Sequence, residues 1–132
     1  SNALKFLGVS RISFASPYVR EINDMAIDFL KEAGFITVHC SEVSTILDNY
    51  GQGELLPEKV FNLGLKADHK DSQAVILSCT DMRSVEVISK LEEMLDKPVI
   101  SSNQAMMFEA MRVTGIDDSM TEYGKLLRTS RL

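Results

Sequence analysis

The stretch Ala74-Val75-Ile76-Leu77-Ser78-Cys79-Thr80-Asp81 decides the fold of this chain. It begins with four consecutive aliphatic residues and ends in small polar residues around a thiol. A short, continuous apolar run of this kind is typical of a strand that is buried on both faces of a parallel sheet. We therefore predict a central strand over residues 74–79, with Cys79 at its carboxyl end.

Three further strand patterns surround this one, and helix patterns separate them. The strand patterns cover residues 11–16, 35–40 and 98–101. The helix that follows the first strand has apolar residues at three- and four-residue spacing, and Gly34 ends it. Later helices are predicted after Pro57, over residues 85–95, over 105–111 and over 123–127. The six apolar positions of the first helix are Ile22, Met25, Ala26, Phe29, Leu30 and Ala33.

Repeated strand–helix–strand units predict an α/β fold with a parallel sheet covered on both faces. The expected architecture is a three-layer sandwich around a four-stranded parallel sheet with strand order 2-1-3-4. Ser1-Asn2-Ala3 is typical of a remnant left by tag removal, so residues 4–132 are interpreted as a single α/β domain. A chain of 132 residues, 45% of them hydrophobic, is long enough to bury a core.

Composition excludes several classes of function. The formal net charge is −5 and no cluster of Lys or Arg interrupts it, which argues against a nucleic-acid partner. The apolar runs are too short for a membrane span. Two cysteines and two histidines form no zinc-binding pattern, so no metal or cofactor is expected. Separated cysteines without a disulfide framework favour the cytoplasm.

Cys79 is the candidate reactive residue. In parallel sheets, ligands bind at the carboxyl ends of the strands, where the strand order reverses. We expect a helix to start immediately after Cys79, with Thr80 or Asp81 as its cap. Such a helix N-terminus would favour the thiolate form and would bind a carboxylate through its free N–H groups, including that of Thr80. The alternative is a small, unreactive core cysteine.

Two other residues are candidate substrate contacts. Tyr18 follows the first strand and could donate a hydrogen bond to a carboxylate, although a partly buried structural tyrosine fits equally well. Asn49 lies in a polar segment, residues 41–56, which shows no clear periodicity and is long for a connecting loop. Its alternative is ordinary turn chemistry. Cys40 ends the second strand, two strand spacings from Cys79, or roughly 10 Å. That is too far for a disulfide, and Cys40 is interpreted as structural.

Taken together, these segments resemble the C-terminal half of maleate cis-trans isomerases and arylmalonate decarboxylases, in the aspartate/glutamate racemase superfamily. The similar segments run in the same order over nearly the whole chain. Asp81 departs from the family pattern, in which Cys-Thr is usually followed by Asn. The segments are Arg11-Ile12-Ser13-Phe14-Ala15-Ser16-Pro17-Tyr18, Phe29-Leu30-Lys31-Glu32-Ala33-Gly34-Phe35, Asp48-Asn49, Ser78-Cys79-Thr80-Asp81, Lys97-Pro98-Val99-Ile100-Ser101-Ser102-Asn103-Gln104-Ala105 and residues 111–127.

The resemblance implies one half of a two-domain fold with one catalytic cysteine in each half. Cys79 would be the catalytic cysteine of this half, with Tyr18, Asn49 and Thr80 as contacts to a small carboxylic acid. No cofactor or metal is implied. The partner would be the missing N-terminal domain or a second copy of the chain. The function implied is cysteine-dependent isomerisation; an arylmalonate-type decarboxylase, an amino-acid or hydantoin racemase, and a non-catalytic anion-binding domain remain alternatives.

Overall fold

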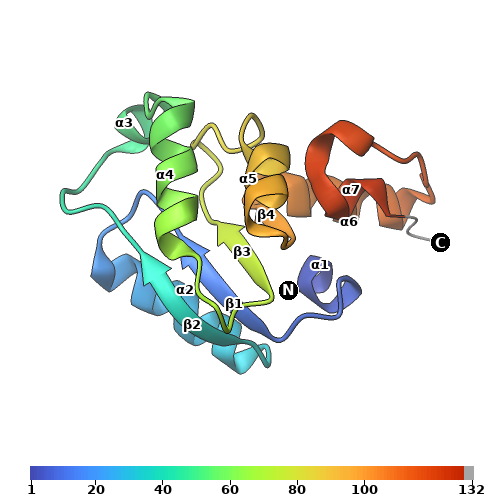
Figure 1. The fold of residues 1–132 in the computed structure, drawn as a ribbon, viewed down its shortest axis with the longest axis horizontal. Helices are drawn as coiled ribbons and strands as arrows, with labels where there is room; N and C mark the ends of the chain where they lie inside the picture. The colour runs from blue at the N-terminus through green and yellow to red at the C-terminus, as the bar shows by residue number, and fades with distance from the viewer. Residues whose placement is uncertain (130–132) are drawn as a thin grey trace.

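A computed structural model describes residues 1–129 of the chain. Its single sheet has four parallel strands in the order β2-β1-β3-β4, as the sequence predicts (Figure 1). Each strand agrees with its predicted range to within two residues at either end. The strands are β1 (Arg11–Ala15), β2 (Ile36–Ser41), β3 (Ala74–Leu77) and β4 (Val99–Ser101).

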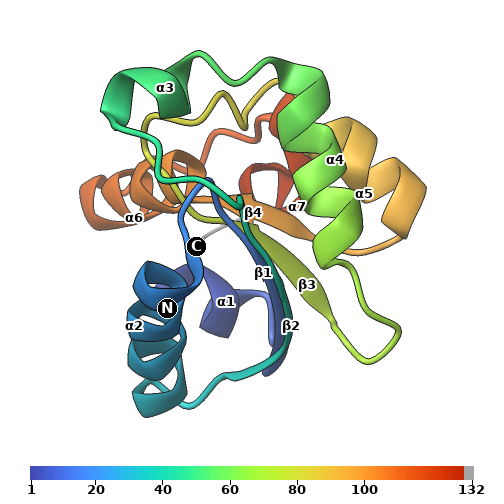
Figure 2. The same cartoon turned by 90° about the vertical axis from the view of Figure 1, so that its left-hand side faces the viewer.

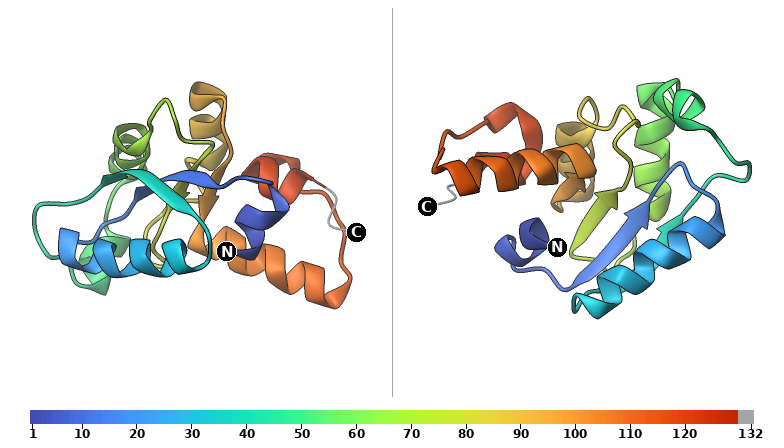
Figure 3. Two further views of the ribbon diagram at one scale, coloured as in Figure 1. Left: turned by 90° about the horizontal axis from the view of Figure 1, so that it is seen from below. Right: turned by 180° about the vertical axis from the view of Figure 1, so that it is seen from behind.

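Helices cover both faces of the sheet, which confirms the three-layer sandwich. Figure 2 shows α1, α2 and α6 on one side of the sheet and α4 and α5 on the other. Figure 3 shows α6 and α7 together at the end of the sheet that carries β4. The helices are α1 (Asn2–Phe6), α2 (Arg20–Glu32), α3 (Asn49–Gly53), α4 (Pro57–Ala67), α5 (Ile88–Leu95), α6 (Ser102–Thr114) and α7 (Gly124–Arg128), with a 3₁₀ turn at Thr121–Tyr123.

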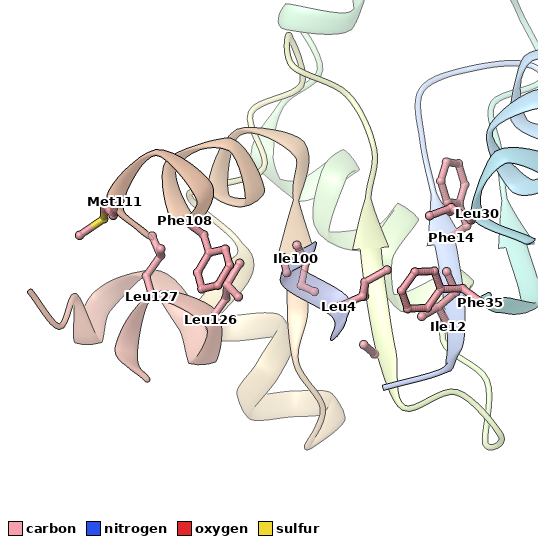
Figure 4. Packing of buried hydrophobic residues seen from close by; sticks show 12 residues of the cluster. Leu4, Ile12, Phe14, Leu30, Phe35, Ile100, Phe108, Met111, Leu126 and Leu127 are labelled. Carbon is pink, nitrogen blue, oxygen red and sulfur yellow. The ribbon is translucent and has the colours of Figure 1, made fainter. Parts of the chain in front are cut away.

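Alternating strand residues divide the core into two clusters. Ile12 and Phe14 of β1 belong to the cluster on the side of α1, α2, α6 and α7. Figure 4 shows Leu30 and Phe35 beside these two residues, and Phe108 and Leu126 together near β4. The intervening residues of the strands point to the opposite cluster, which α4 and α5 complete. Cys79 and Met82, which follow β3, belong to this second cluster.

The strand register brings the carboxyl ends of all four strands to one edge. Ala15 is level with Ser41 on one side and with Leu77 on the other, and Leu77 is level with Ser101. Ser101 is also the N-cap of α6, in a reciprocal capping box with Gln104. The segments that follow the strands therefore gather at this edge.

Two sequence-based expectations need correction. The face of α2 that the sequence marks as buried is largely exposed, since Ile22, Met25 and Phe29 face outward. Asn23 and Leu30 are the buried residues of this helix, because the Asn23 side chain is bonded to the turn after β1. The sequence also gives no sign of α1, which begins at Asn2 and buries Ala3 and Leu4. The interpretation of residues 1–3 as a tag remnant stays a prediction.

Candidate active site

Cys79 lies in a loop rather than at the start of a helix. Helix α5 begins at Ile88, so the expected helix N-terminus next to the thiol is wrong. The residues between Cys79 and Ile88 are irregular because Met82 and Val87 pack into the second core cluster. The buried Ser84 hydroxyl also donates a hydrogen bond to the Met82 carbonyl. No helix macrodipole therefore acts directly on this thiol, and its environment is set by individual groups.

Two hydrogen bonds reach the Cys79 sulfur, and the Tyr18 phenol lies beside it. The backbone N–H of Asp81 donates to it at 3.3 Å, and the thiol donates to the side-chain oxygen of Gln52 at 3.3 Å. An N–H donor stabilises a thiolate, whereas a carbonyl acceptor stabilises the protonated thiol. The Cys79 side chain is otherwise enclosed, with only 2% of the residue exposed. The sulfur thus has an amide oxygen, a backbone N–H and a phenol as polar neighbours.

A buried polar turn places Tyr18 at the same edge. The hydroxyl of Ser16 donates to the side-chain oxygen of Asn23, which is fully buried, and accepts from the backbone N–H of Tyr18 at 3.1 Å. The Asn23 amide in turn donates to the Tyr18 carbonyl at 3.4 Å. These bonds fix the chain where it leaves β1 and enters α2.

The Tyr18 phenol lies beside Cys79. Its pKa is raised well above the ordinary tyrosine value, first by burial, then by its hydrogen bond with the Cys79 side chain and by the charges of Cys79 and Asp81. The phenol therefore remains protonated and keeps its ability to donate at any physiological pH. The expectation that Tyr18 and Cys79 meet at the carboxyl edge of the sheet is confirmed.

The segment 41–56 contains a short helix that the sequence does not reveal. Asp48 is the N-cap of α3, and its carboxylate accepts from the Gly51 N–H at 2.7 Å. Figures 1 and 2 show α3 next to the loop that follows β3. A β-carbon built on Gly53 would lie 3.6 Å from the Asp81 carbonyl oxygen, so the two backbones are in close contact.

Gln52, rather than Asn49, is the side chain of α3 that reaches the thiol. Asn49 is the first residue of α3 and is exposed, and its role as a substrate contact stays a prediction. Sequence reasoning missed Gln52 because the segment was interpreted as a loop. The available signal was Asp48, since an Asp N-cap followed by a turn of helix would have placed Gln52 on a defined face.

Thr80 is exposed and joins the Cys79 loop to α6. Its carbonyl accepts from the Asn103 side-chain amide at 3.0 Å. This bond ties the segment after β3 to the segment after β4, so the loop is held from both sides. The predicted contact of Thr80 with substrate remains a prediction.

Cys40 does not join the site. It ends β2, with β1 between it and β3, and both cysteines are free thiols. Burial raises the pKa of the Cys40 thiol to about 11, with the charge of Glu42 as the next cause. Cys40 is therefore protonated at neutral pH, which agrees with its interpretation as structural. Within residues 1–129, no group of three or more His, Cys, Asp or Glu residues is placed to hold a metal ion.

Comparison with known proteins shows the family of the chain. The family model for arylmalonate decarboxylase matches residues 1–127, nearly the whole chain. The chain belongs to the arylmalonate decarboxylase family. Its relatives in this family include a maleate isomerase of Alcaligenes faecalis, 27% identical over 127 residues, which cover 96% of this chain and 50% of that protein. An arylmalonate decarboxylase of Bordetella bronchiseptica is 28% identical over 116 residues, covering 86% of this chain and 48% of that protein.

Solved structures share the fold. A crystal structure of arylmalonate decarboxylase superposes with a TM-score of 0.86 at 27% identity, covering 96% of this chain and 56% of that one. A maleate cis-trans isomerase of Nocardia farcinica, a mutant with a covalently bound succinylcysteine intermediate, superposes with a TM-score of 0.91 at 22% identity, covering 96% and 52%. The chain thus spans about half the length of the curated relatives it matches, as the resemblance to one half of a two-domain fold implies. No helix among residues 1–129 is long and apolar enough to cross a membrane.

Proposed function

We propose that this chain supplies one half of the active site of a maleate isomerase-like enzyme that acts on a small carboxylic acid, with Cys79 as its reactive residue. The observation that carries the proposal is the placement of the Tyr18 phenol and the Asp81 N–H on one buried thiol. Two donors beside the sulfur can stabilise negative charge on it or on a substrate oxygen, in a site from which water is largely excluded. The maleate isomerases among its relatives support this choice of reaction.

The reaction proposed is a reversible addition. A thiolate bonds to one alkene carbon of the cis-diacid, and the electron pair of the double bond takes a proton at the other carbon. The resulting single bond rotates, the same carbon loses a proton, and the carbon–sulfur bond breaks to give the trans-diacid and the thiolate. A succinyl group on cysteine is the product of the first step, and the Nocardia farcinica structure carries such an intermediate.

Each candidate residue has a role in this scheme. Cys79 exchanges the proton or forms the bond to carbon. Tyr18 and the N–H groups of Cys79 and Thr80 bind a carboxylate and stabilise the enediolate form that develops during addition and protonation. Asn49 contacts the substrate from α3. The second cysteine comes from a domain that this chain lacks, or from a second copy of the chain, since Cys40 lies on the far side of β1.

The test combines the chain with the N-terminal half of the Alcaligenes faecalis maleate isomerase and follows conversion of maleate to fumarate by proton NMR. We expect turnover only with both parts present. The Cys79→Ser variant should be inactive, whereas Cys40→Ser, the matched control, should retain activity. Robust turnover by the purified chain as a monomer, or full activity of Cys79→Ser, would contradict the proposal.

Decarboxylation is the second candidate, because an arylmalonate decarboxylase is as similar to the chain as the maleate isomerases are. Here Cys79 would protonate the enediolate that remains after carbon dioxide leaves. The same two-part preparation, supplied with phenylmalonate, distinguishes this activity by the release of carbon dioxide. Loss of both activities, with retained binding of a small carboxylate, would favour the non-catalytic anion-binding alternative.

A further inference from the structure

One buried polar side chain at the site has no part in the scheme above. Gln52 is 6% exposed, and its side-chain oxygen accepts from the Cys79 thiol at 3.3 Å. Its side-chain nitrogen donates to the Leu47 carbonyl at 2.9 Å. Because a carbonyl oxygen can only accept, the amide nitrogen must face Leu47, and the amide oxygen must then face the sulfur.

With this orientation, the Gln52 amide oxygen acts as a hydrogen-bond acceptor for the Cys79 S–H. An amide oxygen is an acceptor without a proton to give, so it pairs with S–H and is repelled by a thiolate. The Asp81 N–H on the same sulfur has the opposite preference. Gln52 is therefore the acceptor that directs the S–H, whereas the Asp81 N–H and the Tyr18 phenol are donors beside the same sulfur.

Gln52 is also held firmly in place. Asp48 caps the short helix that carries it, and Gly53, the next residue, packs on the backbone of Asp81. Both polar ends of the Gln52 side chain are bonded, so its rotamer is fixed at the point where it meets the sulfur.

We infer that Gln52 is a positioning residue that directs the S–H of Cys79 and opposes its ionisation until substrate takes over the contact. The inference rests on the proposed function in one respect, namely that Cys79 is the reactive cysteine. It adds the group that directs the S–H of this cysteine in the absence of substrate. It also implies that α3 must yield before substrate can reach the sulfur, since Gln52 and Tyr18 enclose it.

The experiment measures the rate at which iodoacetamide alkylates Cys79 as a function of pH, with peptide mass spectrometry to separate it from Cys40. Two variants of similar size change the acceptor. Gln52→Met removes the amide oxygen and should lower the pH of half-maximal alkylation by about 0.5 to 1 unit, the size of one neutral hydrogen bond. Gln52→Glu places a negative charge beside the sulfur and should raise that pH.

Tyr50→Ala is the matched control, because Tyr50 is 74% exposed on the same helix. It should leave the half-maximal pH unchanged. A role in filling space alone would change the limiting rate at high pH without moving the half-maximal pH in either variant, and that result would overturn the inference. Circular dichroism shows whether each variant is folded.

A second measurement needs no change at Gln52. In the Cys40→Ser protein, the infrared S–H stretch belongs to Cys79 alone, and a bond to an amide oxygen should shift it below the frequency of a free thiol. A band at the free-thiol frequency would overturn the inference while leaving the proposed function intact. If Cys79 reacts no faster than Cys40 at every pH, with Gln52 unaltered or replaced, the proposed function fails and this inference fails with it.

Discussion

The backbone amide of Asp81 lies 3.3 Å from the sulfur of Cys79, and both residues belong to a loop. Donation to the sulfur at this position therefore comes from individual groups, the Asp81 N–H and the Tyr18 phenol, rather than from the summed dipole of a helix. A contact of this kind is sensitive to shifts of the loop by a few tenths of an ångström. The reactivity of Cys79 should accordingly depend on the segments that hold this loop, which are α3 and the start of α6.

The phenol of Tyr18 should make the folded chain less stable at alkaline pH. Its pKa is raised above 10.0 in the folded state, so the unfolded chain ionises first as pH rises. The stabilising contribution is complete below about pH 10 and is lost above it. Urea unfolding between about pH 8 and about pH 11 should show a steeper loss for the unaltered chain than for Tyr18→Phe. Tyr50→Phe, at an exposed tyrosine, is the control; a slope in Tyr18→Phe equal to that of the unaltered chain would contradict the prediction.

Asn23→Ala should destabilise the chain by about 2 kcal/mol, because it leaves the buried Ser16 hydroxyl without its acceptor and opens a small cavity. The turn that carries Tyr18 should loosen with it. Urea unfolding measures the loss of stability. Asp28→Ala, an exposed position on the same helix, should change stability by no more than about 0.5 kcal/mol. Equal free energies of unfolding for the two variants would show that the hydrogen bond between Ser16 and Asn23 does not stabilise the fold.

Asp48→Ala should increase access to Cys79. The change removes the cap of α3, which costs about 1 kcal/mol and should raise the population of the opened segment about fivefold. Alkylation of Cys79 at neutral pH should accelerate by a similar factor. Glu54→Ala, beyond the end of α3, is the control. An unchanged rate in Asp48→Ala would show that α3 does not limit access.

Gly64→Ala should destabilise the interface between α4 and α5. A β-carbon there would lie 2.7 Å from one methyl of Leu91 and 3.4 Å from a methyl of Leu77, and Leu91 is fully buried. Repacking of such a site costs about 1 to 3 kcal/mol, which exceeds the gain of about 1 kcal/mol from replacing a helical glycine with alanine. Thermal unfolding compares it with Gly53→Ala, whose β-carbon meets nothing closer than 3.6 Å and which should be neutral or stabilising.

The sheet was predictable because its signals are local and repeated. The aliphatic run of β3 and the alternation of strands and helices fix both the parallel pairing and the strand order. Pro57 at the first position of α4 was equally clear. These features depend on short stretches of sequence, and the structure confirms them.

The site was harder to predict because it depends on tertiary contacts. Thr80 and Asp81 have the side chains of helix caps, yet burial of Met82 and Val87 holds the segment out of helical conformation. On α2, the bond from Ser16 to Asn23 turns a polar residue inward and leaves apolar ones outside. Helix α3 positions Gln52, but its five residues are too few to show a helical period in the sequence.

The parallel sheet also decides when the thiol acquires its surroundings. Parallel neighbours cannot be joined by a tight turn, so every strand pair forms only after a long stretch of chain has closed. Cys79 and Gln52 are 27 positions apart in sequence, and Tyr18 is more distant still. Contacts of such long range form late and slowly in folding. A nascent or unfolded chain therefore lacks these contacts, and Cys79 meets Tyr18 only once β1 and β3 have joined.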